Sequence, residues 1–128
     1  MIVVIGFIEK NQQILITQRA PDTHFGGFWE LPGGKMEEGE TPSLALIREF
    51  KEELGIEIAN AELLCKISQA PIEFYLYHVL AYHHEPRLLA GQMDMSWGNI
   101  QDIQMFTFPP TNQLFFDVWE NYKREMPN

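Results

Sequence analysis

The sequence predicts a mixed α/β fold in which helices cover both faces of a mixed β-sheet. Several runs of β-branched and aromatic residues, each bounded by polar, glycine or proline residues, indicate strands. Two other segments carry apolar residues at helical spacing and therefore indicate helices. The 128 residues, of which 45% are hydrophobic and 21% charged, suffice for one domain with a buried core, and we expect residues 1–128 to form it.

The first strands are expected close to the N-terminus. The β-branched run at residues 2–8 and the run at 14–17 flank a polar stretch, which indicates a hairpin. A loop follows at residues 20–27, and a short apolar strand at 28–31 ends in a Pro-Gly-Gly turn.

The next segment predicts a well-capped helix. Thr41 is a good N-cap, Pro42 suits the first helical position, and Gly55 ends the helix as its C′ residue. On a helical wheel four apolar side chains fall roughly opposite the acidic ones, and we expect them to face the core: Leu44, Ile47, Phe50 and Leu54.

The second half of the chain predicts more strands and a closing helix. Residues 58–68 and 72–83 have strand-like patterns, and residues 93–108 should supply another strand or two around 103–105. Pro109 and Pro110 end this stretch, and residues 112–123 indicate a helix whose N-cap we expect to be Thr111. The expected apolar stripe of that helix is Leu114, Phe115, Val118 and Tyr122.

Composition excludes several classes of protein. The net charge of −9 argues against binding of nucleic-acid polymers, which requires a basic surface. No apolar run approaches the roughly 18 residues of a membrane-spanning helix, and the N-terminus lacks the basic region of a signal peptide. Cys65 is the single cysteine, so no internal disulfide forms. We therefore expect a cytoplasmic protein without a membrane partner, and a monomer.

An acidic row on the first helix is the most informative feature of the chain. Glu49, Glu52 and Glu53 have i, i+3, i+4 spacing, which stacks three carboxylates on one helical face. Together with a backbone carbonyl from the turn at Gly34, they suit an oxygen-preferring divalent cation such as Mg²⁺, for which Mn²⁺ can substitute. Such ions let an acidic site hold a polyphosphate. Glutamates alone would indicate a solvated face.

Around this row the chain resembles the Nudix box, a glycine-to-glycine pattern of fixed spacing. The matching residues are Gly34, Glu40, Arg48, Glu49, Phe50, Glu52, Glu53, Gly55 and Ile56. A chance match to the fixed identities is on the order of one in 10^8 per starting point. Phe50 departs slightly, because an aliphatic residue is more usual there.

The likeness extends over almost the whole chain, to the MutT branch of the Nudix hydrolases. ILITQRAPDTHFGGFWELPGGKMEEGETP resembles the second strand, loop and box entry of that branch, and FPPTN resembles its FPPAN segment. The resemblance implies a Nudix-type α/β/α sandwich. It also implies hydrolysis of 8-oxo-dGTP to 8-oxo-dGMP and pyrophosphate, which removes oxidised guanine from the nucleotide pool and avoids mutation.

The same resemblance assigns site residues. Gly34, Glu49, Glu52 and Glu53 map onto metal-binding positions, and Arg48 onto the arginine that orients the following glutamate. With Arg48 these glutamates form the expected catalytic group; Glu49 is the first candidate for general base and Glu53 for strongest metal ligand.

Three further residues match substrate-binding positions of the branch. Arg19 matches an arginine that contacts the substrate, Leu31 a position that lines the base pocket, and Asn112 the asparagine that hydrogen-bonds oxidised guanine. An amide offers a donor and an acceptor to a purine edge. Taken alone, Arg19 would be a strand-end charge and Asn112 a turn or cap residue.

One position departs from the branch pattern. The glutamate that usually precedes Gly-Gln, a metal ligand or base in the family, is Ala90 here. Asp94 lies nearby and could replace it only if the loop bends differently. The segment SQAPIEF also lacks the charged Asp-Arg pair of the branch. These departures leave open the number of metal ions, the general base and the preferred base. Hydrolysis of CTP, another pyrimidine triphosphate or a nucleotide sugar is an alternative, as is a Nudix module that senses a nucleotide without cleaving it.

Overall fold

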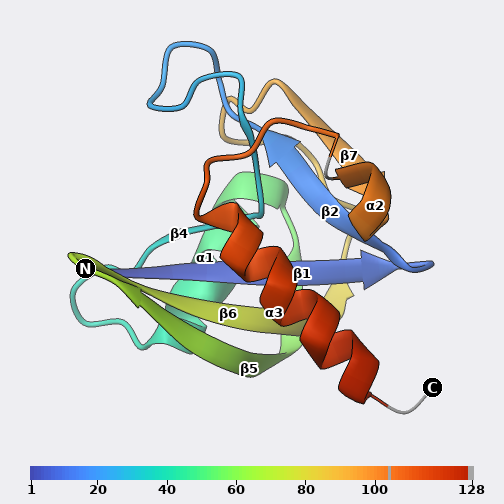
Figure 1. Cartoon of the computed structure of the whole chain (residues 1–128). Helices are drawn as coiled ribbons and strands as arrows, with labels where there is room; N and C mark the ends of the chain where they lie inside the picture. Colours follow the sequence, from blue (N-terminus) through green and yellow to red (C-terminus); the bar gives the residue numbers. More distant parts are fainter. Residues whose placement is uncertain (104, 127–128) are drawn as a thin grey trace.

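The computed structural model describes residues 1–103 and 105–126 (Figure 1). Its elements follow the predicted order of strands with two main helices, and β3, β4, β7 and α2 are short. In chain order they are β1 (Ile2–Lys10), β2 (Gln13–Gln18), β3 (Trp29–Glu30), β4 (Gly33–Lys35), α1 (Pro42–Leu54), β5 (Glu57–Gln69), β6 (Ile72–His83), β7 (Asp94–Gly98), α2 (Ile100–Ile103) and α3 (Asn112–Glu125).

Strand β1 lies at the centre of a mixed sheet with the order β3-β2-β1-β6-β5. It pairs parallel with β6 and antiparallel with β2 and β4, while β7 pairs antiparallel with β2. Helices α1 and α3 cover opposite faces of this sheet (Figure 1). The predicted mixed sheet between two helices is thus confirmed.

Each face of β1 contributes to a separate core. Val4 and Ile8 pack against the buried side of α1, whereas Ile5 and Phe7 pack beneath α3. This alternation follows from the two-residue period of a strand, and it explains why β1 is apolar almost throughout. Phe7 stacks on Trp119 of α3 with ring centroids 4.6 Å apart, which fixes α3 across the sheet.

The predicted boundaries of α1 are confirmed. The hydroxyl of Thr41 accepts a hydrogen bond of 3.2 Å from the amide of Leu44, and Pro42 opens the helix. Gly55 has φ = 67°, a left-handed conformation that costs glycine little, and its amide returns to the carbonyl of Lys51.

The predicted core face of α1 is partly wrong. Phe50 and Leu54 are buried, but Leu44 and Ile47 are 54% and 38% exposed, and Ala45 and Leu46 are buried in their place. The buried side is therefore turned towards the acidic row. As a result Glu49 and Glu53 lie beside the core-facing residues, not opposite them.

The region before α3 also differs from expectation. The prediction of a strand around residues 103–105 is wrong at Ile103, because this residue ends helix α2. Residue 104 lies outside the described part of the chain. Asn99 starts α2 because its Oδ1 accepts a 2.8 Å hydrogen bond from the amide of Asp102. The strand of this region is β7, and Gly33–Lys35, expected as a turn, forms β4.

The start of α3 departs from prediction in its cap. Thr111 has helical backbone angles and makes no side-chain cap; its hydroxyl instead donates to Oε1 of Gln69 at 3.0 Å. Phe115 is buried as expected, whereas Leu114 is 39% exposed. Among the described residues, no helix has the length and apolarity needed to cross a membrane.

Candidate active site

The glycine turn brings the backbone of β4 against the acidic row of α1. Gly34 pairs with Val4 of β1, which fixes its position at the sheet. A Cβ atom at Gly34 would lie 2.5 and 2.7 Å from the two carboxylate oxygens of Glu49. A side chain at position 34 would displace the Glu49 carboxylate, and this close approach joins the turn and the helix into one site.

Arg48 connects the acidic residues of the box. Its Nε and Nη2 donate to the two carboxylate oxygens of Glu40 at 2.6 and 3.0 Å. Its Nη1 donates to Glu49 at 2.9 Å and to Glu52 at 3.1 Å, and Nη2 also reaches the carbonyl of Lys35 at 3.0 Å. This bidentate pairing lowers the pKa of the Glu40 carboxyl. The expected contact between Arg48 and Glu49 is present.

Glu53 is the least compensated acid of the row. Its Oε2 is buried and lacks a hydrogen-bond partner among the described residues. Desolvation, reinforced by the charges of Glu49 and Glu30, raises the pKa of Glu53 from 4.5 to about 8. Burial also raises the pKa of Glu49, although Arg48 opposes this shift. A buried carboxylate oxygen without a partner is what a metal cation would satisfy.

The acidic row supplies oxygen donors that suit a divalent metal ion, but its carboxylates do not converge on one point. In residues 1–103 and 105–126, no three His, Cys, Asp or Glu side chains converge as a metal cluster. The reason is that Arg48 holds Glu49 and Glu52, whose side chains are 14% and 59% exposed. A cation bound between Glu53, Glu49 and Gly34 would have to compete with Arg48 for the Glu49 carboxylate.

The expected substrate residues lie in two places. Arg19 follows β2, where Nη1 donates to Glu30 at 3.0 Å and Nε to the carbonyl of His24 at 2.7 Å. Asn112 opens α3 and is 7% exposed, yet its side-chain amide makes no hydrogen bond within the described residues. Leu31 is 2% exposed and belongs to the apolar cluster beneath α3.

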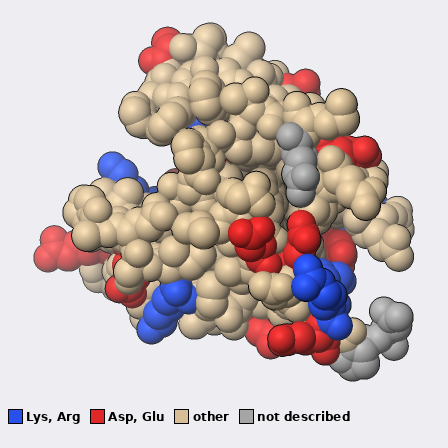
Figure 2. Space-filling view, in the orientation of Figure 1, with Lys and Arg blue, Asp and Glu red and all other residues tan. Residues whose placement is uncertain are grey.

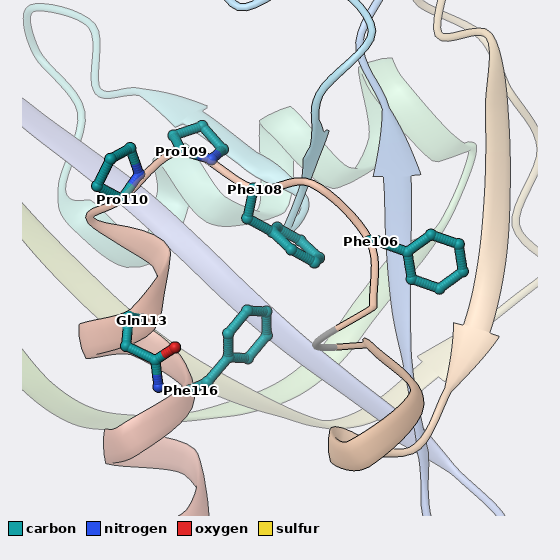
Figure 3. Close-up of a pocket in the computed structure, with 6 residues that line it drawn as sticks. All are labelled: Phe106, Phe108, Pro109, Pro110, Gln113 and Phe116. Carbon is teal, nitrogen blue, oxygen red and sulfur yellow. The ribbon is translucent and has the colours of Figure 1, made fainter.

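A cavity of about 320 Å³ lies beside the start of α3 (Figure 3). Its walls are mostly aromatic and proline rings, with Gln113 as a polar member, and neither Leu31 nor Asn112 lines it. Figure 2 shows that charged side chains gather near the C-terminal end of α3, while the surface around its start is largely uncharged. The lining residues are Phe106, Phe108, Pro109, Pro110, Gln113 and Phe116.

The loop that carries Ala90 packs against the end of α1. The amide of Leu89 donates to the carbonyl of Glu53 at 3.0 Å, and Nε2 of Gln92 donates to the same carbonyl at 3.1 Å. Oε1 of Gln92 accepts from the amide of Ala90 at 2.9 Å. Position 90 is therefore held next to Glu53, whereas Asp94 binds the amide of Met95 through its carboxylate.

Two residues of the site escaped sequence reasoning. Gln92 fixes the loop at Glu53 through both ends of its amide. Glu30 bonds Arg19 and is one of the charges that raise the pKa of Glu53. Glu30 could have been suspected from its position, because it ends the short strand β3 that leads into the glycine turn of the site.

Comparison with known proteins identifies the family. The NUDIX domain model matches residues 1–124. An 8-oxo-dGTP diphosphatase of Haemophilus influenzae is 38% identical over 118 residues, which cover 88% of this chain and 86% of that protein. A CTP pyrophosphohydrolase of Escherichia coli K12 is 38% identical over 85 residues, 63% of each chain.

Solved structures agree. A MutT structure, from work on Aliivibrio salmonicida and Vibrio cholerae, superposes with a TM-score of 0.79 at 32% identity, and covers 91% of this chain and 94% of that one. The chain belongs to the Nudix family, and it is a hydrolase of the MutT type that acts on phosphoric anhydride bonds. Hydrolases of this family generally require a divalent metal ion.

The pKa of Glu53 predicts how stability depends on pH without metal. Between about pH 4.5 and 8 the folded protein retains a proton on Glu53 that the unfolded chain releases, so the free energy of unfolding falls as pH rises. Glu53→Gln should remove this slope. In thermal denaturation with a chelator, raising the pH from 5 to 8 should lower Tm by at least about 4 °C more in wild type than in the variant. Glu52→Gln, which changes an exposed acid of the same helix, is the control. Equal slopes in wild type and Glu53→Gln would contradict the burial of Glu53.

The close approach at Gly34 predicts a selective defect. Gly34 is not left-handed, so Gly34→Ala should fold, but the new Cβ would displace the Glu49 carboxylate. We expect Mg²⁺ affinity, measured by calorimetric titration, to fall about 10-fold or more. Gly33→Ala makes the contrast: its Cβ would meet the carbonyl oxygen of Val4 at φ = 153°, and should cost about 1–3 kcal/mol of stability. Unchanged Mg²⁺ binding by Gly34→Ala would remove Gly34 and Glu49 from the metal site.

Proposed function

We propose that this chain is a Mg²⁺-dependent nucleoside triphosphate pyrophosphohydrolase that converts 8-oxo-dGTP to 8-oxo-dGMP and pyrophosphate. The observation behind the proposal is the buried, unpartnered oxygen of Glu53, together with the Glu49 carboxylate that lies against Gly34. The 8-oxo-dGTP diphosphatase of H. influenzae, alike over most of its length, supports the substrate. We expect residues 1–128 to act as one domain, as a monomer in the cytoplasm.

The carboxylates of Glu49, Glu52 and Glu53, with the carbonyl of Gly34, would hold Mg²⁺ or, in its place, Mn²⁺. Bound there, the ion would neutralise the polyphosphate and lower the pKa of an attacking water. The role of Arg48 is to orient Glu49 through the 2.9 Å hydrogen bond while Glu40 fixes the other side of the guanidinium. Glu49, with its pKa raised by burial, is the group we propose as the proton acceptor.

Base recognition is proposed for Asn112. Asn112 is 7% exposed and its amide has no partner among the described residues, so the amide can offer a donor and an acceptor to a guanine edge. Phe115 and Phe116, on the turn that follows, share an apolar cluster with Leu31. A nucleotide that cannot pair with the amide would leave it desolvated, which disfavours that nucleotide. The acidic surface suits free nucleotides held through a metal and disfavours nucleic-acid polymers.

Hydrolysis of CTP is the second candidate function, because a CTP pyrophosphohydrolase is also 38% identical over 63% of the chain. The two candidates share their chemistry and differ in the base that Asn112 would meet. The ratio of kcat/KM values for the two nucleotides therefore distinguishes them.

Pyrophosphate release should be fastest from 8-oxo-dGTP when it is assayed with Mg²⁺ beside dGTP and CTP. Glu53→Gln should lower kcat about 100-fold or more, because it removes the charge that we propose for the metal. Asn112→Ala should cut the preference for 8-oxo-dGTP about 10-fold while kcat for dGTP changes little. Unchanged turnover by Glu53→Gln would refute the metal assignment. A dominant activity on CTP would instead support the proposed reaction and replace 8-oxo-dGTP by CTP as the substrate.

Restoring a carboxylate at position 90 should strengthen the site. The loop is held at the carbonyl of Glu53, so the side chain of Ala90→Glu starts next to the acidic row. We expect tighter Mg²⁺ binding or a higher kcat, by about 10-fold, because a further oxygen ligand becomes available. Met93→Glu places the same charge in the same loop from a residue that is 52% exposed, and should have no effect. Equal effects of the two variants would show that only net charge matters.

A further inference from the structure

Glu30 occupies a position between two parts of the proposed site. Its carboxylate accepts a 3.0 Å hydrogen bond from Nη1 of Arg19, and its charge is one of those that raise the pKa of Glu53. Glu30 thus contacts the arginine that follows β2 and acts on the acidic row of α1 only through its charge. No residue of the Nudix box supplies this connection, because the box match begins at Gly34.

The backbone sets the position of Glu30 before its side chain makes any contact. Glu30 pairs with Thr17 of β2, and the amide of Arg19 donates to the carbonyl of Phe28 at 2.9 Å, so Arg19 and Glu30 are diagonal neighbours on one face of the ladder. The amide of Trp29 donates to the carbonyl of Thr107 at 2.8 Å, which secures the other edge of β3. The strand cannot shift without losing these bonds.

The guanidinium of Arg19 is held at two of its three nitrogens. Nε donates to the carbonyl of His24 at 2.7 Å and Nη1 to Glu30 at 3.0 Å. Within the described residues Nη2 makes no hydrogen bond or ion pair, and the side chain of Arg19 is 33% exposed. A free arginine loses considerable rotamer freedom when it binds an anion, whereas one already fixed loses little.

We propose that Glu30 is a positioning residue that fixes Arg19 in the orientation in which it meets the phosphates of a nucleoside triphosphate. The inference rests on the proposed function, because it requires a polyphosphate substrate at this site. Glu30 acts through Arg19, whose Nη1 donates to its carboxylate at 3.0 Å, and is a positioning residue and not a metal ligand. Its removal should therefore weaken the binding of triphosphate and leave the binding of Mg²⁺ alone unchanged.

A double-mutant cycle on Arg19 and Glu30 tests this coupling. Binding of non-hydrolysable α,β-methylene analogues of dGTP, 8-oxo-dGTP and CTP is measured by calorimetry with Mg²⁺ in otherwise wild-type protein, so that Glu53 and the proposed metal site stay intact. Arg19→Ala should weaken binding about 10-fold when Glu30 is present and less than about 3-fold in Glu30→Ala. Glu30→Gln, which keeps the acceptor and loses the charge, should give an intermediate value. In the active enzyme Glu30→Ala should raise KM more than it lowers kcat.

The ion pair of Glu9 and Lys123 provides a matched control. Its atoms are 2.7 Å apart, and its side chains are 20% and 38% exposed, but it joins β1 to the C-terminal end of α3. The same cycle on this pair should change thermal stability and leave triphosphate binding unaltered. A similar response of the Arg19 and Glu30 cycle would mean that Glu30 is only structural.

Three other outcomes would overturn the positioning role of Glu30. Additive effects of Arg19→Ala and Glu30→Ala on triphosphate binding would overturn the positioning role while leaving the proposed function intact. Loss of Mg²⁺ affinity by about 10-fold in Glu30→Gln, measured with otherwise wild-type protein and no nucleotide, would make Glu30 a metal ligand and overturn the proposal. Wild-type protein that binds none of the triphosphates would contradict the proposed function and this role together.

Discussion

The ion-pair network around Arg48 is the interaction on which the site depends. Helix α1 carries Glu49, Glu52 and Glu53 within five residues, and Glu40 lies in the loop between β4 and α1. Like charges at this spacing destabilise a helix by about 0.2–0.5 kcal/mol per pair. One guanidinium bonds Glu40, Glu49 and Glu52, which offsets the repulsion and holds the row in place. Glu53 lies outside this network, and its buried Oε2 has no hydrogen-bond partner among the described residues.

Burial of α1 gives the network its orientation. Phe50 and Leu54 each follow a glutamate by one residue, so packing the apolar pair against the sheet brings Glu49 and Glu53 to the edge of the core. There β4 presents Gly34, whose missing side chain leaves room for the Glu49 carboxylate. Packing energy from the core thus holds partly buried acids in a position that they would not adopt alone. The same arrangement explains why the pKa values of Glu49 and Glu53 are raised.

Much of this organisation could be predicted from the sequence, because it rests on local signals. Thr41, Pro42 and Gly55 fixed the ends of α1, and the alternating apolar pattern located β1, β2, β5 and β6. The exposure of Leu44 and Ile47 could not be predicted, because a helical wheel shows which residues share a face but not how that face is turned towards the sheet. Likewise α2 was not predicted, because it is only four residues long and its single sequence signal is the asparagine cap at Asn99.

The acidic residues of the candidate site could be proposed from the sequence, but their contacts could not. The spacing of the acids identified Glu49, Glu52 and Glu53, but not that Arg48 would hold two of them. Glu30 and Gln92 come from segments distant in sequence from α1; the strand ladder brings Glu30 to Arg19, and a loop hydrogen bond brings Gln92 to the carbonyl of Glu53. Pairings of this kind depend on tertiary structure, which local patterns do not record.

We propose that the acidic row of α1 exchanges part of its pairing with Arg48 for a divalent ion. A crystal structure of the protein with Mn²⁺, solved with anomalous scattering, tests it most directly. We expect an anomalous peak bonded to Glu53, Glu49 and the carbonyl of Gly34, with Nη1 of Arg48 released from at least one of the glutamates that it now contacts. A peak elsewhere, or an occupied site in which every Arg48 contact persists, would contradict the claim.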